Sequence, residues 1–226
     1  MFSRSPTFDE LSGRSDDHLS ILDNGILLHR EVVEPFRRLC AAAAVDGLDI
    51  AIASGYRDYD RQLAIWNAKA EGRRPLLDSA GRPLEPAQMS DDQIALAILR
   101  WSALPGCSRH HWGTDMDVWD RAAVDEGYQL QLVPEEYAPG GPFAALSSWL
   151  AEHAATYGFS RPYAEDRGGV APEPWHLSYV PLARQFEARL DRAFIRKVLD
   201  NSELKLKAAV LARLDEIADR FILPRP

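Results

Sequence analysis

Two short stretches decide how this chain folds: Ser-Arg-His-His-Trp-Gly-Thr-Asp-Met-Asp at residues 108–117 and Glu-Pro-Trp-His at residues 173–176. Together they supply imidazole and carboxylate side chains within a few residues of one another. A catalytic zinc site needs three such protein ligands, an open position for water and a nearby general base. The two stretches therefore predict a mononuclear metal site.

The first stretch passes from a loop into a strand. After Gly113 the residues alternate, so that Met116 and Val118 face the core while Asp117 faces the opposite side. Gly113 permits a tight turn, and His110 arrives from the loop just before it. We expect His110 and Asp117 to converge on one ion.

The second stretch contains a proline between its two polar residues. Pro174 disfavours a helix, so Glu173 is expected at a bend and His176 on the strand that follows. This predicts Glu173 as a base beside the metal rather than a ligand. His111 and Asp115 flank the predicted site, and we interpret both as structural residues or as hydrogen-bond partners of the ligands.

Composition limits the classes of function. With 226 residues the chain can bury a core without disulfides, and its net charge of −8 disfavours binding to nucleic acid or anionic membranes. No stretch is apolar enough to span a membrane. Cys40 and Cys107 have no metal-finger spacing. The N-terminus lacks the apolar core of a signal peptide, which predicts a cytoplasmic location, with a periplasmic or extracellular one as the alternative.

The chain divides into three predicted parts: a poorly regular N-terminal arm (1–29), a central domain (30–182) and a helical C-terminal extension (183–226). Apolar spacing and capping signals predict the elements of the central domain. These are a strand over 48–54 and helices near 36–46, 58–70, 90–101 and 142–157. The extension is expected to form two amphipathic helices, 183–199 and 202–222, which pack on the domain or pair with another subunit. We predict an α+β fold, with a small, mainly antiparallel sheet that carries the metal residues and helices around it.

The residues quoted above resemble the zinc D-alanyl-D-alanine carboxypeptidases of the VanY type, within the group that includes lysostaphin-like enzymes and hedgehog domains. The pattern of that group is Ser-x-His, a glycine, a metal-binding Asp, and a later Glu-x-Trp-His. The matching residues are Ser108, His110, Gly113, Asp117, Glu173, Trp175 and His176. A third element, Ser54-Gly55-Tyr56-Arg57 followed by Gln62, also matches. The resemblance covers roughly residues 30–182 and implies the hedgehog/D,D-peptidase fold.

The resemblance implies that His110, Asp117 and His176 bind Zn²⁺ and that Glu173 is the catalytic base. The chemistry agrees, since zinc lowers the pKa of a bound water towards ~7 and a neighbouring carboxylate can take its proton.

By the same resemblance, Arg57 stabilises the developing oxyanion, and Gln62 and Ser108 help to hold the terminal carboxylate of the substrate. Two features near the site depart from the family pattern. Asp115 replaces a usually small residue, which predicts a more acidic cleft. The pair at 111–112 is bulkier than usual, which predicts a reshaped pocket.

The predicted function is a zinc-dependent D,D-carboxypeptidase that hydrolyses peptidoglycan-derived peptides ending in D-Ala-D-Ala. One alternative is a peptidoglycan endopeptidase of the L-Ala-D-Glu endolysin type. Another is a zinc-holding binding module without turnover, although a structural zinc would need neither Glu173 nor Arg57. The helices of the extension also raise the prospect of a homo-oligomer.

Overall fold

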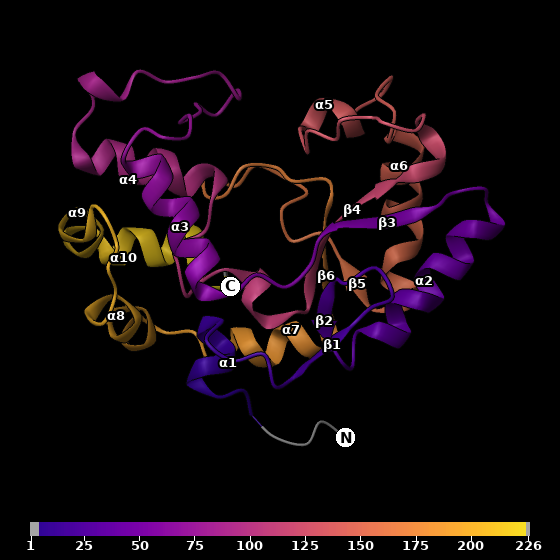
Figure 1. The fold of residues 1–226 in the computed structure, drawn as a ribbon, viewed down its shortest axis with the longest axis horizontal. Coiled ribbons are helices and arrows are strands. Elements are labelled where there is room, and N and C mark those ends of the chain that lie inside the picture. The colour runs from indigo at the N-terminus through magenta and orange to yellow at the C-terminus, as the bar shows by residue number, and fades with distance from the viewer. Residues whose placement is uncertain (1–4, 225–226) are drawn as a thin grey trace.

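The fold is built on a four-stranded antiparallel sheet. The computed structural model describes residues 5–224 (Figure 1). The strands lie in the order β3 (Ile50–Ser54), β4 (Asp115–Asp120), β6 (His176–Tyr179) and β5 (Phe159–Ser160). The prediction of an α+β fold with a small antiparallel sheet is confirmed.

The register of this sheet brings the two quoted stretches together. Asp117 on β4 lies directly opposite His176 on β6. Met116, Val118 and Leu177 are fully buried, as the alternation of the strand predicts. Polar residues at alternate positions are therefore held on the other face of the same two strands.

Helices cover the sheet on one side of the molecule and pack against each other on the other side (Figure 1). The helices α2 (Val33–Val45) and α6 (Ala144–His153) lie near the strands, whereas α3 (Tyr59–Ala70) and α4 (Asp91–Trp101) contact one another. Asp58 caps α3, and a Ser90–Gln93 capping box begins α4. The predicted helix bounds agree to within a few residues.

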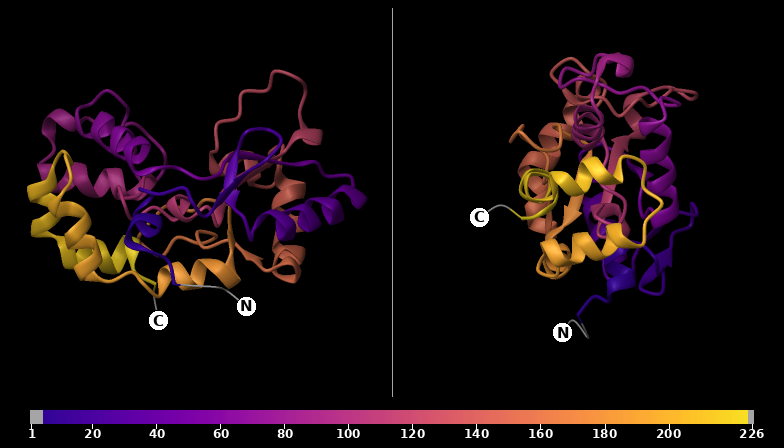
Figure 2. Two further views of the ribbon diagram at one scale, coloured as in Figure 1. Left: turned by 60° about the horizontal axis from the view of Figure 1, so that its bottom comes forward. Right: turned by 90° about the vertical axis from the view of Figure 1, so that its left-hand side faces the viewer.

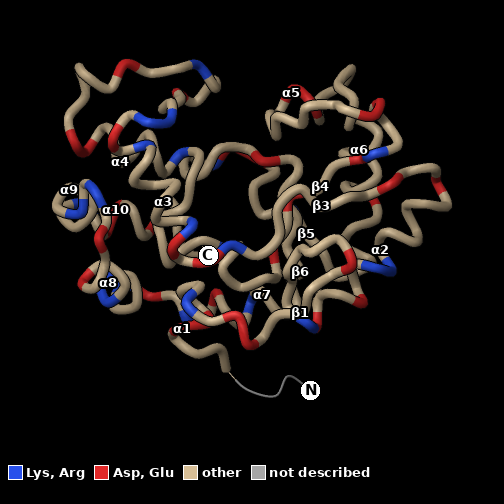
Figure 3. The backbone as a smooth tube through the Cα atoms, viewed as in Figure 1, with Lys and Arg blue, Asp and Glu red and all other residues tan. Residues whose placement is uncertain are grey.

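The connections between these elements contain short turns and one short helix. They are the 3-10 turns Pro86–Gln88, Arg109–Trp112, Arg121–Ala123 and Ala154–Tyr157, and the helix α5 (Pro134–Tyr137). Acidic and basic residues are interspersed around the chain rather than gathered into one stripe (Figure 3). None of the helices in the described range is long and apolar enough to cross a membrane.

The N-terminal arm is more regular than predicted. It contains α1 (Phe8–Ser12), which Thr7 caps, and an antiparallel hairpin of β1 (Leu19–Ile21) and β2 (Leu27–His29). The first four residues of the predicted arm lie outside the described part of the chain. These elements are too short to show a periodic pattern, and packing stabilises them, with Leu28 fully buried.

The C-terminal extension also differs from the prediction of two long helices. Its segments are α7 (Val180–Glu187), α8 (Arg192–Asp200), α9 (Lys207–Ala212), α10 (Leu214–Ile217) and a π-helical turn (Ala218–Ile222). The predicted break near Asp200 is present, but a second break precedes Asp191, which caps α8. Leu206, with a left-handed φ of 61°, lies within the break that follows Asp200, and a third break at Arg213 separates α9 from α10. Figure 2 shows this extension beside α3 and α4, where Trp66 Nε1 donates to the Lys205 carbonyl at 3.0 Å.

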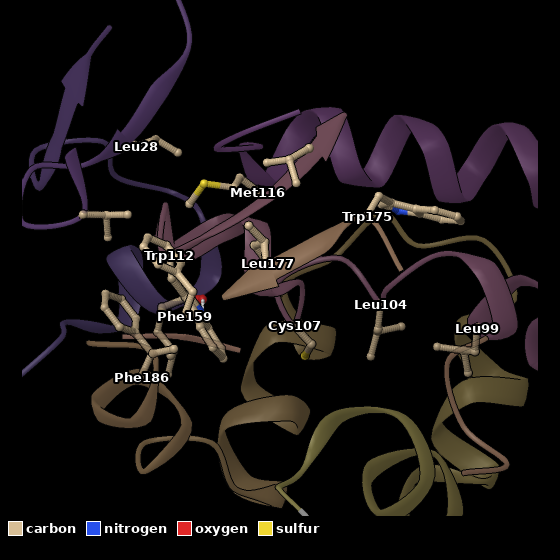
Figure 4. Packing of buried hydrophobic residues seen from close by; sticks show 14 of the residues in the cluster. Leu28, Leu99, Leu104, Cys107, Trp112, Met116, Phe159, Trp175, Leu177 and Phe186 are labelled. Atoms are coloured by element: carbon tan, nitrogen blue, oxygen red, sulfur yellow. Dashed lines mark hydrogen bonds between the residues drawn. The ribbon is translucent and has the colours of Figure 1, made fainter. Parts of the chain in front are cut away.

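Aromatic side chains join the extension to the core near the sheet. Trp112 and Phe186 stack with ring centroids 5.4 Å apart, and Met116, Phe159 and Leu177 belong to the same buried cluster (Figure 4). Full burial of each such side chain contributes about 1.5–3 kcal/mol to folding. The first helix of the extension is thus part of the packed domain.

Candidate active site

Three predicted ligands converge at one end of the β4–β6 pair. The donor atoms of His110, Asp117 and His176 all lie within 4.8 Å of one another, and the three side chains are buried. His110 Nε2 is 3.4 Å from Asp117 Oδ2, and His176 Nδ1 is 3.2 Å from Asp117 Oδ1. Gly113 makes the turn before β4 with φ +66°, and a Cβ there would lie 2.7 Å from the backbone nitrogen of His29. Two imidazoles and a carboxylate in this arrangement fit Zn²⁺.

Each histidine has one nitrogen occupied by the protein and the other directed at the site. His110 Nδ1 lies 2.8 Å from the Gly55 carbonyl oxygen, to which its N–H donates, so Nε2 is available to a metal. His176 Nε2 lies 3.0 Å from Asp115 Oδ2, so Nδ1 is available. Such outer partners fix the tautomer and the orientation of the ring.

Asp115 is fully buried and lies behind the site rather than in the cleft. Its carboxylate accepts hydrogen bonds from Thr114 Oγ1 (2.7 Å), Ser178 Oγ (2.9 Å) and Arg109 Nε (2.5 Å). Burial alone would raise the pKa of Asp115, but Arg109 and His176 outweigh it and hold that pKa below its ordinary value. The expectation of a more acidic cleft is wrong, because this carboxylate is neutralised by its partners and does not line the pocket.

Glu173 lies where the proline predicted, in the bend before β6. Its backbone N–H donates to the Tyr163 carbonyl at 2.8 Å, and its Oε2 is 3.5 Å from His176 Nδ1. Burial, which His176 opposes and Asp117 reinforces, raises the pKa of Glu173 to about 7. A carboxyl group with this pKa can both accept and return a proton near neutral pH.

Arg57 follows β3 and is fixed at both its backbone and its side chain. The guanidinium donates to Gln62 Oε1 at 2.8 Å and to Ser54 Oγ at 3.3 Å. The backbone N–H donates to the His110 carbonyl at 3.1 Å, and the backbone carbonyl lies 2.5 Å from His111 Nδ1. The third matching element is therefore joined to the first by direct hydrogen bonds.

Gln62 has a protein partner at each end of its side-chain amide. It is fully buried, its Oε1 accepts from Arg57, and its Nε2 donates to the Ala103 carbonyl at 2.8 Å. Both ends of the amide thus have protein partners, and Gln62 does not line the pocket. Ser108 does line it.

The bulky pair after His110 faces away from the pocket. His111 Nε2 accepts the Gly106 N–H at 3.0 Å, and burial lowers the pKa of His111 to about 3, so the ring is neutral. Trp112 is fully buried in the core. The prediction that this pair reshapes the pocket is wrong, because neither residue is part of its wall.

A pocket of about 230 Å³ joins the groups described above. Its lining includes Arg57, Ser108, His110, Asp117, Glu173 and His176. The residues of the wall that sequence reasoning missed include Trp101, Leu132 and Tyr163. Leu132 has φ +53°, and the Tyr163 ring lies 4.9 Å from that of His176. These residues come from connections or element ends, where no periodic signal marks the side that faces the site.

A buried His-Asp-His cluster beside a carboxylate and a fixed guanidinium defines the chain as a zinc metallopeptidase. A family model for D-alanyl-D-alanine carboxypeptidase, VanY, matches residues 25–182. The chain belongs to this VanY family.

Individual proteins of known sequence or structure are also similar to this chain. An uncharacterized Haemophilus influenzae protein is 32% identical over 122 residues, which are 53% of this chain and 93% of that protein. The bifunctional D-Ala-D-Ala dipeptidase and D-Ala-D-Ala carboxypeptidase VanXYC of Enterococcus gallinarum is 27% identical. That match covers 71% of this chain and 70% of the VanXYC chain. The crystal structure of a mutant D,D-pentapeptidase VanY from a VanB-type resistance cassette, in complex with Zn(II), gives a TM-score of 0.51 at 25% identity. That match covers 85% of this chain and 88% of the other.

Proposed function

We propose that this protein is a D,D-carboxypeptidase that releases the terminal D-alanine from peptidoglycan-derived peptides ending in D-Ala-D-Ala. The observation that carries the proposal is the presence of Glu173 and Arg57 in the same pocket as the His-Asp-His cluster. A zinc that only stabilised the fold would need neither group. Membership of the VanY family supports the reaction class.

We assign His110, Asp117 and His176 as the zinc ligands. Zn²⁺ held there supplies a Lewis acid that polarises the scissile carbonyl and makes water acidic enough to act near neutral pH. The three residues are already held within 4.8 Å, with the outer nitrogen of each histidine occupied. Folding of the chain therefore already places the three ligands for the metal.

Glu173 has the position and the environment of a general base. It takes a proton from the attacking water as the new carbon–oxygen bond forms. It then gives that proton to the nitrogen of the departing D-alanine as the carbon–nitrogen bond breaks.

Arg57 stabilises the negative charge that develops on the carbonyl oxygen, an effect that is typically worth about 3–4 kcal/mol. Gln62 and Ser54 hold the guanidinium in place through the two hydrogen bonds described above. We therefore assign Gln62 as a positioning residue for Arg57. Ser108 stays a proposed contact to the substrate.

The test is to identify the products that the zinc-loaded protein forms from a muropeptide with a pentapeptide stem. We expect free D-alanine and the corresponding tetrapeptide, which mass spectrometry distinguishes from other fragments. Cleavage between L-Ala and D-Glu would instead identify an endopeptidase. No cleavage of any stem peptide by protein that holds zinc would leave the non-catalytic binding module.

The sequence also predicted a cytoplasmic location and pairing through the C-terminal helices, and both stay predictions. The buried side chains of α8 to α10 include Ile195, Val198, Val210 and Ile217, which belong to the core of this chain. Any pairing must therefore use the exposed faces of these helices. Light scattering on the purified protein measures the oligomeric state, and cell fractionation measures the location.

A further inference from the structure

Lys69 is a half-buried cation that the proposed mechanism does not use. It lies on α3 seven residues after Gln62, on the same face of the helix. Gln62 donates to the Ala103 carbonyl, and Lys69 Nζ donates to the Ser102 hydroxyl oxygen at 2.7 Å. Ser102 and Ala103 both line the catalytic pocket. Lys69 therefore stands directly behind one wall of that pocket.

The hydrogen bond from Lys69 determines what Ser102 can offer to a ligand. An ammonium group has donors only, so the Ser102 oxygen must be the acceptor. The hydroxyl keeps its own proton, which it donates to no group in the part of the chain that the structure describes. A hydroxyl group that is polarised by a cation at a pocket wall is suited to donate a hydrogen bond to an anion.

The positive charges around Lys69 outnumber the negative ones, which favours the binding of an anion. Burial, together with the nearby Arg74 and Arg57, lowers the pKa of Lys69 to about 8, and Glu173 is the carboxylate that opposes this. Arg74 is exposed and forms no ion pair with any residue between 5 and 224. Like charges held together in a partly desolvated place are unfavourable unless an opposite charge joins them.

We propose that Lys69 and Ser102 recognise the free α-carboxylate at the C-terminus of the peptide substrate. The inference rests on the proposed carboxypeptidase function and deepens it. The Ser102 hydroxyl donates a hydrogen bond to the carboxylate, and Lys69 supplies the balancing charge behind it. The pair contributes to the role that family resemblance gave to Gln62 and Ser108, since the Gln62 amide already has a protein partner at each end.

A purely structural role for Lys69 has different consequences. If Lys69 only tied α3 to the end of α4, its loss would reduce stability and affect all substrates alike. Carboxylate recognition affects only substrates that carry a free carboxylate, and it acts mainly through KM.

The test compares a peptide ending in free D-Ala-D-Ala with the same peptide carrying a C-terminal amide. In Lys69→Met we expect kcat/KM for the free acid to fall about 10- to 100-fold, as for loss of a charge-assisted hydrogen bond. The amide should change by less than about 3-fold, and Lys69→Arg, which keeps the charge, should restore most of the loss for the free acid. Lys205→Met is the matched control, because Lys205 is an exposed lysine that pairs with Glu71 after the same helix.

Binding provides a readout that does not depend on turnover. Calorimetry on zinc-loaded Glu173→Ala protein, with and without Lys69→Met, measures affinity for D-Ala-D-Ala and for its C-terminal amide. We expect Lys69→Met to weaken binding of the acid alone. If Lys69→Met does not fold, Ser102→Ala makes the same comparison with a smaller change.

The two proposals fail in different ways. Equal losses for acid and amide, or an unchanged affinity for D-Ala-D-Ala, would overturn carboxylate recognition by Lys69 and leave the proposed function intact. Failure of the zinc-loaded wild type to release D-alanine would overturn the proposed function. In that case the calorimetric comparison still decides whether Lys69 binds the carboxylate.

Discussion

The catalytic pocket has two walls that are built in different ways. One, the strand wall, consists of Asp117 on β4 and His176 on β6, whose positions follow from the register of two paired strands. The other, the helix wall, consists of Arg57 and Ser102, which side chains of α3 hold in place. Backbone pairing of two strands organises the strand wall, whereas side-chain hydrogen bonds organise the helix wall. The two walls should therefore respond differently to mutation.

A buried ionic network supports the strand wall from behind. Asp115 connects His176 to Arg109, and Arg109 continues to Glu187 on α7 in the C-terminal extension. The extension, which carries no predicted chemistry, thus contributes to the orientation of a proposed ligand. A buried carboxylate paired in this way is costly to break, because its partner is left without a counter-charge.

The N-terminal arm supports the helix wall. Gly13 at the end of α1 accepts hydrogen bonds from the Tyr59 N–H at 2.9 Å and the Tyr56 hydroxyl at 3.1 Å. It also lies so close to His111 that an added Cβ would be 2.4 Å from His111 Nδ1. Because His111 contacts the Arg57 carbonyl, the arm is connected to the proposed oxyanion donor.

The largest effect is expected from the strand wall itself. His176→Ala removes one of three proposed ligands, so bound zinc and D-alanine release should both fall below detection. Metal analysis of the purified protein and a D-alanine assay measure the two effects. His153→Ala is the control, since this half-buried histidine on α6 makes an edge contact with the Trp149 ring and does not line the pocket. Zinc retained at the wild-type level in His176→Ala would contradict the assigned ligand set.

A mutation on the helix wall should lower the catalytic rate and leave the zinc content unchanged. Arg57→Met removes the oxyanion donor, and we expect kcat to fall about 10²- to 10³-fold with zinc content unchanged. Steady-state kinetics combined with metal analysis separates the two. A loss of zinc in this variant would show that the walls are not independent.

The network behind the strand wall should have a smaller effect, mainly on metal affinity. Asp115→Asn keeps the shape of the side chain but removes the charge that orients His176. We expect the Kd for zinc to rise about 10- to 100-fold, measured by competition with a chelating dye. An unchanged zinc affinity together with reduced stability would limit Asp115 to balancing the charge of Arg109.

The smallest expected effect on the site itself comes from the arm. Gly13→Ala and Gly25→Ala both place a side chain at positive φ, +75° and +81°, but only the former meets a neighbour within 4 Å. Both should lose about 1 kcal/mol of unfolding free energy through backbone strain. Gly13→Ala should lose about 1–3 kcal/mol more through the clash with His111, measured by urea denaturation. Equal losses of unfolding free energy in the two variants would mean that Gly13 is not in tight contact with His111.

The positions of Asp117 and His176 within their own strands were predictable because short-range rules determine them. The two-residue period of a strand places Asp117 on the face away from the buried Met116 and Val118. Pro174 separates the bend at Glu173 from the strand that begins at His176. These rules act within a few residues. They therefore hold before the rest of the fold is known.

The helix wall and the two ends of the chain were less predictable because long-range contacts determine them. Nothing in the sequence shows that Gln62 reaches Ala103 or that Lys69 reaches Ser102, since both pairs are more than thirty residues apart. In the arm and the extension, elements of three to nine residues form through packing rather than through their own propensity. Asp115, which the sequence suggested as a structural residue or a hydrogen-bond partner of a ligand, was the visible sign of the network behind the site.

The central claim is that Glu173 acts as the base in zinc-dependent release of D-alanine. Its most direct test compares the zinc-loaded wild type with Glu173→Gln, which keeps the size of the side chain but cannot accept the proton. Both proteins should contain the same amount of zinc, and the variant should release D-alanine from a D-Ala-D-Ala peptide about 10²- to 10⁴-fold more slowly. Full activity in Glu173→Gln at equal zinc content would contradict the account.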